Sequence, residues 1–352
     1  MFMALMSSYQ RAACSLFCLL LCLGLAQARE VEVAGGRYPL TQDGVSIVLP
    51  YLSSHDLSAP NPAITRLVVA IHSSSYNPGV YLKRVERLLE DVPGEKSRTL
   101  VVAPHFLDED VLPGALERDF VYWTNYPFRG SSKASWEGRK LRFSAFEAVD
   151  GLLQDLVAKG NYPNLRSVVI LGHSAGGQMV NRYAAAGRFE SDAANPRGIE
   201  VRYLVMAPSS YLYFSGERGT GGATDHFSVP QNPPKGYNDW GYGLSKLYSY
   251  HKRCGVTADW MIAQYRKKRV LYLVGSEDRD PSDTSLARFP EAMVQGRQRL
   301  ERGQTYYNFL VHFFGDSIKE RQRFEVVPGA RHSGRELMQA AVAVRFVLGR
   351  DS

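Results

Sequence analysis

The sequence predicts an α/β fold with a mostly parallel central sheet, helices on both faces of that sheet and an inserted region. Short apolar runs such as residues 67–71 and 99–103 alternate with longer segments whose apolar side chains recur at helical spacing. A continuous apolar run is typical of a strand buried on both faces, and alternating strands and helices are typical of a parallel sheet. With 352 residues and 45% hydrophobic side chains, the chain can bury a sizeable globular core.

The first half of the chain alternates expected strands with expected helices. Ser144 and Glu147 have the spacing of a capping box, which indicates the start of a helix, and Gly160 ends that helix. The expected strands are residues 30–33, 45–49, 67–71 and 99–103, and the expected helices are residues 80–89 and 144–159.

The second half continues the pattern around a glycine-rich turn at residues 172–177. A helix is expected to follow this turn and to end near Ala185. The expected strands here are residues 168–171, 201–206, 270–274 and 324–327, and the last expected helix is residues 335–348.

One stretch interrupts this alternation. Residues 208–259 are rich in Gly, Tyr, Pro and Ser and have weak periodicity, and a loop of this length in a compact domain is usually functional. We therefore expect a single domain over residues 29–352, with residues 209–265 inserted as a cap or substrate-facing region. The many aromatic side chains of this insertion either line a pocket or pack a small core of its own.

The N-terminus has the features of a secretory signal peptide. Residues 1–28 contain an apolar run and end in the small-x-small sequence Ala-Gln-Ala. Cleavage there predicts a periplasmic or secreted protein with no stable membrane insertion. It would also leave Cys254 as the only cysteine, so the mature chain could form no internal disulfide.

The charge of the chain does not indicate a nucleic-acid partner. The formal net charge is +7, but the 42 basic and 35 acidic residues are mixed along the sequence. The largest basic run, residues 266–269, directly precedes an apolar segment and is interpreted as a solvated helix end. We therefore expect no nucleic-acid binding.

A candidate nucleophile lies in the turn at residues 172–177, whose sequence is Gly-His-Ser-Ala-Gly-Gly. A Gly-x-Ser-x-Gly sequence between a buried strand and a helix places its serine on a sharp, strained turn with the hydroxyl exposed above the sheet. Ser174 is the predicted nucleophile. The backbone N–H of Ala175, at the start of the helix, is the first predicted oxyanion donor.

A nucleophilic serine needs a base, and the base needs an orienting acid. His332 is the only histidine after the last expected strand and is the predicted base. The acid should follow the preceding strand, where Glu277, Asp278 and Asp280 are available. Asp278 lies three residues beyond the bend at Gly275 and is the preferred candidate, with Asp280 and Glu277 as alternatives.

A second oxyanion donor should come from the loop after the strand at residues 67–71. The backbone N–H of Ser73 is the predicted donor, with that of Ser74 as the alternative. His72 is expected to order this loop by hydrogen bonding rather than to act as a base.

With this serine, acid and histidine in this order, the chain resembles the α/β-hydrolase superfamily over about residues 30–350. Residues 208–211 and 238–244 also resemble a group of bacterial α/β hydrolases, and there is some likeness to secreted polyhydroxyalkanoate depolymerase-like esterases. The resemblance implies an α/β-hydrolase fold and an exported serine hydrolase. Ser73 stands where many lipases and esterases have a glycine after the histidine.

The function expected from these residues is hydrolysis of carboxylic esters through a Ser-His-Asp triad and an acyl-enzyme. The sequence contains no Gly-x-Gly-x-x-Gly after its first strand, no P-loop and no His-Glu-x-x-His, so we expect neither cofactor nor metal. The substrate would be a small-molecule or polymeric ester. The alternatives are a serine peptidase or amidase and, in a different class, a non-catalytic ligand-binding protein on the same fold; substrate-binding residues and oligomeric state stay open.

Overall fold

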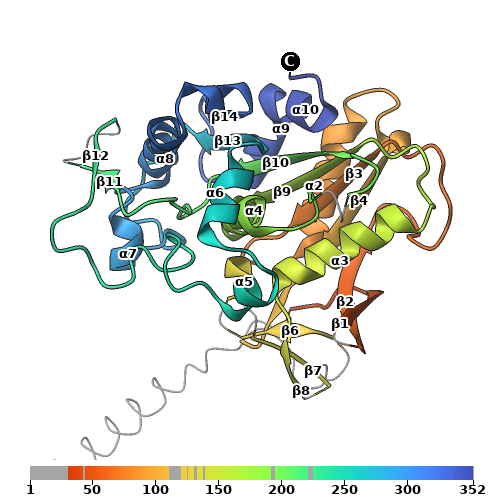
Figure 1. The fold of residues 1–352 in the computed structure, drawn as a ribbon. Coiled ribbons are helices and arrows are strands. Elements are labelled where there is room, and N and C mark those ends of the chain that lie inside the picture. The colour runs from red at the N-terminus through yellow and green to blue at the C-terminus, as the bar shows by residue number, and fades with distance from the viewer. Residues whose placement is uncertain are drawn as a thin grey trace, which may run out of the picture. The chain divides into compact units, whose positions relative to one another are not determined.

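A computed structural model gives the fold of the chain after its N-terminal segment (Figure 1). The structure describes residues 31–42, 44–110, 120–124, 126–130, 133–137, 139–191, 195–220 and 225–351. The proposed signal peptide, residues 1–28, lies outside the described residues. Within the described part of the chain, no helix combines the length and the apolar character that a bilayer span requires.

The central sheet has eight strands in the described ranges, in the order β1-β2-β4-β3-β9-β10-β13-β14. The pairs from β4 to β14 are parallel, whereas β1–β2 and β2–β4 are antiparallel. The strands are β1 (Gly36–Gln42), β2 (Val45–Ser53), β3 (Arg66–Ile71), β4 (Thr99–Pro104), β9 (Ser167–His173), β10 (Glu200–Met206), β13 (Arg269–Gly275) and β14 (Gln322–Val327). This confirms the predicted mostly parallel sheet.

The prediction for the first strand was wrong. Residues 31–34 form no strand, and β1 begins at Gly36. The register pairs Gly36 with Tyr51, and Tyr38 and Leu40 are the side chains of β1 that are buried in the core. Alternating burial of this kind identifies a strand with one solvent-facing side, which a search for continuous apolar runs does not find.

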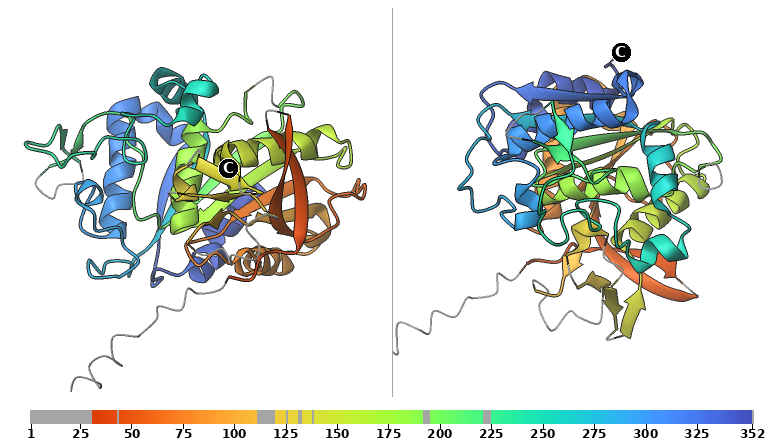
Figure 2. Two further views of the ribbon diagram at one scale, coloured as in Figure 1. Left: turned by 90° about the horizontal axis from the view of Figure 1, so that it is seen from below. Right: turned by 60° about the vertical axis from the view of Figure 1, so that its left-hand side comes forward.

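Helices cover both faces of the central sheet (Figures 1 and 2). One face packs against α2 (Pro78–Glu90), α9 (Gly334–Gln339) and α10 (Ala341–Leu348). The other face packs against α3 (Ala145–Ala158), α4 (Ala175–Ala186) and α8 (Arg299–Phe314). The predicted capping box is present. The Ser144 hydroxyl accepts from Phe146 N, and the Glu147 carboxylate accepts from Ser144 N.

The last helix does not run unbroken over residues 335–348 as expected. Ala340 is extended, with φ −61° and ψ 135°, and it separates α9 from α10. The break lets Leu337 and Met338 on one side, and Phe346 and Val347 on the other, join the same buried cluster. No glycine or proline marks the break in the sequence.

A small second sheet was not expected from the sequence. It joins β5 (Leu107–Asp108), β6 (Tyr122–Trp123), β7 (Lys133–Trp136) and β8 (Arg139–Arg142), and it lies at the lower edge of Figure 1. Trp123 is fully buried, and its indole N–H donates to the Phe143 carbonyl. These two- and four-residue strands are too short to give a periodic signal.

The insertion contains β11 (Arg218–Gly219), β12 (Phe227–Ser228), α5 (Ser249–Arg253) and α6 (Ala258–Tyr265), and much of the rest is irregular. Its aromatic side chains pack inward beside α8: Tyr211 stacks on Tyr306 at 4.5 Å, and Tyr213 contacts Phe309 at 4.6 Å between ring centroids. Tyr211, Tyr213, Phe214, Trp240, Tyr242 and Tyr250 are buried. These contacts favour an aromatic core over an aromatic-lined pocket.

The basic run at residues 266–269 is a solvated helix end only in its first half, where the exposed Arg266 and Lys267 follow the end of α6. Lys268 is buried and forms an ion pair with Glu190. Arg269 begins β13 and pairs with Glu200 and Asp351. The second half of the run therefore anchors the start of a core strand.

A buried carboxylate connects α3 to the end of α4. Asp150 accepts hydrogen bonds from the Tyr183 hydroxyl at 2.7 Å, from Arg188 N at 2.9 Å and from Phe189 N at 3.0 Å, all on one oxygen. Burial raises the pKa of the Asp150 carboxyl from 3.8 to about 6, against the opposing effect of these donors.

This carboxyl predicts a pH-dependent difference between the wild type and Asp150→Asn. Because its pKa is higher in the folded chain than in the unfolded chain, the wild type should lose free energy of unfolding as pH rises through about 4 to 6. The asparagine keeps the accepting oxygen and removes the charge. Urea unfolding should show the variant gaining about 2 kcal/mol relative to the wild type between pH 4 and pH 8. A gap that is independent of pH would contradict this.

Candidate active site

The strand-to-helix turn at Ser174 is completed within a single residue. β9 ends at His173 and α4 begins at Ala175, while Ser174 has φ 57° and ψ −119°. A positive φ is strained for a residue with a side chain and persists only where the surroundings hold it. Here the Ser174 N–H donates to the Met206 carbonyl and the Ser174 carbonyl accepts from Gln178 N, each at 2.9 Å.

Glycines let three backbone segments meet around this turn. A Cβ on Gly172 would lie 2.4 Å from the backbone of Gly176, and a Cβ on Gly176 would lie 2.5 Å from the Ile71 carbonyl oxygen. A Cβ on Gly177 would lie 2.6 Å from the Met206 carbonyl oxygen. No side chain fits at these approaches, so the glycines set how closely α4 packs against β3 and β10.

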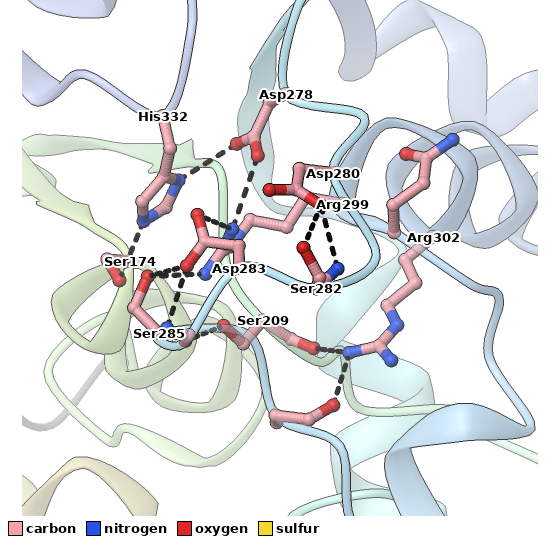
Figure 3. Close-up of polar contacts among 12 residues, drawn as sticks. Ser174, Ser209, Asp278, Asp280, Ser282, Asp283, Ser285, Arg299, Arg302 and His332 are labelled. Atoms are coloured by element: carbon pink, nitrogen blue, oxygen red, sulfur yellow. Dashed lines mark hydrogen bonds and ion pairs between the residues drawn. The ribbon is translucent and has the colours of Figure 1, made fainter.

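The structure brings Ser174, His332 and Asp278 together in one hydrogen-bonded chain (Figure 3). His332 Nε2 lies 3.1 Å from Ser174 Oγ, and His332 Nδ1 lies 2.8 Å from Asp278 Oδ2. With Nδ1 protonated, the imidazole donates to the carboxylate and accepts from the serine hydroxyl. This arrangement matches the geometry in which a histidine removes the proton of a serine.

Of the three acid candidates, only Asp278 contacts His332 in the described structure. Asp280 is exposed and accepts from the backbone N–H and hydroxyl of Ser282 at 2.8 and 2.6 Å. Glu277 is also exposed and accepts from the Ser276 hydroxyl. The sequence-based preference for Asp278 therefore agrees with the geometry.

The bend at Gly275 explains why Asp278 reaches the histidine. A Cβ on Gly275 would lie 2.1 Å from the Ala330 carbonyl oxygen, so the end of β13 lies directly against the loop that carries His332. Asp278 N then donates to the Gly275 carbonyl at 3.2 Å, which turns the carboxylate back over the sheet edge.

The loop after β3 is held by His72, as predicted. His72 Nε2 accepts from Phe106 N at 2.9 Å, which leaves Nδ1–H to donate to the Ser73 carbonyl at 2.8 Å. Burial lowers the pKa of His72 to about 4, so the ring is neutral and orders the loop rather than acting as a base. Ala175, as the first residue of α4, has its N–H free of the helix's own ladder. The oxyanion role of Ser73 and Ala175 stays a prediction.

Two residues that border the triad were not predicted from the sequence. The His173 ring lies 4.5 Å from the His332 ring between centroids, and burial lowers its pKa well below the usual value, so it is neutral. The guanidinium of Arg299 contacts the second oxygen of Asp278 at 3.2 Å. His173 could have been singled out because it precedes the serine; no local signal points to Arg299.

Cys254 is free and half-buried, and it is 3.7 Å from Glu147 Oε1. Burial raises the pKa of its thiol, as does the neighbouring Glu147. A thiol with a raised pKa is a poor nucleophile, so these contacts favour Cys254 as a packed side chain rather than a reactive one.

Residues 68–345 match the model of the alpha/beta hydrolase family, and the chain belongs to this family. The family assignment agrees with the order of the sheet and with the serine turn at the end of β9. A search of curated proteins gave no match.

Solved structures share the fold. The chain is similar to LpqC, a poly(3-hydroxybutyrate) depolymerase from Bordetella parapertussis, with 20% identity and a TM-score of 0.58 over 92% of this chain and 93% of that one. It is also similar to poly(aspartic acid) hydrolase-1 from Sphingomonas sp. KT-1, with 20% identity and a TM-score of 0.57 over 90% of this chain and 100% of that one.

The close backbone packing predicts that Gly176→Ala destabilises the protein. The added methyl group would meet the carbonyl oxygens of Ile71 and His72 at 2.5 and 2.7 Å, and neither can move without displacing β3. We expect a loss of roughly 3 kcal/mol in the free energy of unfolding, measured by urea titration. Gly35→Ala is the control, because nothing lies within 4 Å of its Cβ position. Equal unfolding midpoints for the two variants would refute this account of the turn.

Proposed function

We propose that this protein is a serine hydrolase that cleaves carboxylic esters through an acyl-enzyme on Ser174. The observation that carries the proposal is the continuous chain of contacts from Ser174 Oγ through His332 to Asp278, with distances of 3.1 and 2.8 Å. The strained backbone at Ser174, a residue that is 7% exposed, adds support, because such strain clusters at functional sites. A binding protein without catalysis would need none of these features.

In the proposed reaction, His332 Nε2 accepts the hydroxyl proton as Ser174 Oγ attacks the ester carbonyl carbon. Asp278 holds the imidazole in the required tautomer and stabilises the imidazolium that forms. The backbone N–H groups of Ala175 and Ser73 would stabilise the oxyanion. His332 then protonates the leaving alcohol, and a water molecule activated by the same histidine releases the acid.

The neutral state of His173 suits this cycle. Its ring faces the ring of His332, and a second positive charge there would oppose formation of the imidazolium. Burial keeps His173 uncharged, so it provides packing for the base without electrostatic cost.

The class of ester that the protein cleaves is also open within this proposal. One structural neighbour is named for a polyester and the other for poly(aspartic acid), whose backbone is an amide. Both small-molecule and polymeric esters are candidate substrates, and amide cleavage is the alternative. A panel of matched esters and anilides of increasing acyl length separates these possibilities.

The first functional prediction concerns Ser174 itself. A fluorophosphonate probe should label the wild type at Ser174, and Ser174→Ala should abolish both labelling and ester hydrolysis while leaving the unfolding free energy nearly unchanged. Ser97→Ala, at an exposed serine in the short helix Lys96–Arg98, is the control and should behave as the wild type. Labelling that survives in Ser174→Ala, or hydrolysis within tenfold of the wild type, would refute the assignment.

A second prediction separates the acid candidates. Asp278→Asn should lower kcat by ~10³-fold or more, because an amide favours the wrong tautomer of His332. Asp280→Asn should change kcat by less than about threefold, since that carboxylate only caps the turn at Ser282. Steady-state kinetics on one ester decide the matter, and a larger effect from Asp280→Asn would show that the acid has been misassigned.

A further inference from the structure

We infer that Arg299 is a positioning residue for the reaction proposed above: its guanidinium holds Asp278 in the orientation that His332 requires. The inference rests on the proposed function for its kinetic consequences. The contact that motivates it runs from Arg299 Nη1 to Asp278 Oδ1 at 3.2 Å, on the opposite carboxylate oxygen from the one that faces His332 (Figure 3).

The guanidinium is itself held at several points. Arg299 Nη1 also contacts Asp283 Oδ2 at 3.2 Å, and Arg299 Nη2 donates to Ser285 Oγ at 2.8 Å. Asp283 in turn accepts from the backbone N–H and the hydroxyl of Ser285, both at 2.7 Å. Arg299 is therefore clamped between the triad acid and a second carboxylate, with little freedom to rotate.

The contact between Arg299 and Asp278 matters because both side chains are buried. The Arg299 side chain is 0% exposed and the Asp278 side chain is 4% exposed. A carboxylate removed from water is penalised as an anion unless a charge or several donors compensate it. His332, while neutral, offers Asp278 one donor and no charge, so Arg299 supplies the positive charge that compensates the buried carboxylate.

Asp283 keeps the guanidinium in place. Burial alone would raise the pKa of Asp283, but the hydrogen bonds from Ser285 and the charge of Arg299 lower it to about 2. The cluster of Asp278, Asp283 and Arg299 then carries one net negative charge, which the imidazolium of His332 neutralises when the serine proton is transferred. The charges are thus arranged for the proton-transferred state.

The same turn of α8 also holds the main chain of the acid. Leu300 N donates to the Asp278 carbonyl at 3.2 Å, next to the residue that holds its side chain. On the far side of the loop, the Ser209 hydroxyl donates to the Ser285 carbonyl at 3.1 Å. Backbone and carboxylate of Asp278 are therefore oriented by consecutive residues of one helix.

Arg302 provides a matched control. It lies one turn further along α8 and is equally buried, but its guanidinium donates to backbone carbonyls, among them those of Gly296, Ala287 and Ser209. Replacing either arginine leaves unpaired groups in the core, whereas only Arg299 contacts the triad. A general packing defect would affect both variants alike.

The test is a double-mutant cycle on ester hydrolysis, with kcat and KM corrected for the folded fraction. Arg299→Gln should lower kcat by ~10²-fold with little change in KM, as a misplaced catalytic group does. In an Asp278→Asn background the same substitution should cost less than about threefold, because Arg299 acts through Asp278. Arg302→Gln should cost less than about threefold in the wild-type background. The inference would be overturned if Arg299→Gln lowered kcat as much in the Asp278→Asn background as in the wild type. Equal losses of kcat in Arg299→Gln and Arg302→Gln would overturn it as well.

Asp283→Asn is the second variant, at a partly exposed site, in case Arg299→Gln does not fold. It releases one side of the clamp and should lower kcat about tenfold in the wild type and have no effect in the Asp278→Asn background. Unchanged kcat in Asp283→Asn with intact folding would count against the clamp.

A readout that needs no turnover separates failure of this inference from failure of the proposed function. The proton between His332 Nδ1 and Asp278 should give a downfield resonance in the one-dimensional proton spectrum of the wild type. That resonance should be lost or shifted in Arg299→Gln and retained in Arg302→Gln. If no ester is hydrolysed but this pattern is found, the proposed function fails and the positioning role stands. If esters are hydrolysed and the resonance is unchanged in Arg299→Gln, the positioning role fails alone.

Discussion

The site depends on one constraint, the approach of backbone to backbone where β9 ends and α4 begins. With hydrogen atoms in place of side chains at Gly172, Gly176 and Gly177, the first turn of α4 lies against the ends of β3 and β10. The chain then has only Ser174 with which to reverse direction, and this residue takes the strained positive φ. The strain is maintained because the sheet on either side is buried and cannot relax without losing its core.

The parallel pairing of the strands brings the other residues of the site to the serine. Because β9, β13 and β14 run in the same direction, their carboxyl ends meet at one edge, and the loops that follow them deliver Ser174, Asp278 and His332 to the same place. This explains why the sequence could predict that these three residues lie together: each is marked by the buried strand that it follows. The core strands were predictable for the same reason, since strands buried on both faces are continuous apolar runs.

The parts that escaped prediction have contacts that are not local in sequence. Arg299 lies 21 residues from the carboxylate that it holds, and nothing around it in the chain marks a partner. The helix that carries it, α8, has arginines and Gly303 at buried positions, so its inward face does not appear apolar. Strand β1 was displaced because its burial alternates, and the break at Ala340 was missed because no glycine or proline marks it and only the cluster that both halves of the helix join explains it.

Buried arginines also supply hydrogen-bond donors to irregular backbone. The insertion has few ladders to satisfy its carbonyl groups, and Arg182 and Arg218 donate to the carbonyls of Gly241 and of Tyr237 and Tyr242. Buried carbonyls must find donors, and a guanidinium supplies five from one side chain. The polar interior beneath the insertion thus stabilises a segment that neither helix nor sheet could stabilise by itself.

The hydrogen bond between Ser174 and His332 joins residues 158 positions apart, and that between Asp278 and His332 spans 54. During synthesis the serine is therefore made long before the histidine that would activate it. Asp278 is also made before the histidine that it contacts. In the proposed mechanism, a chain that stops before His332 has a hydroxyl of ordinary reactivity, because the proton acceptor is still missing. The proposed capacity for covalent chemistry would thus appear only once the loop after β14 has been made and folded against the turn at Ser174.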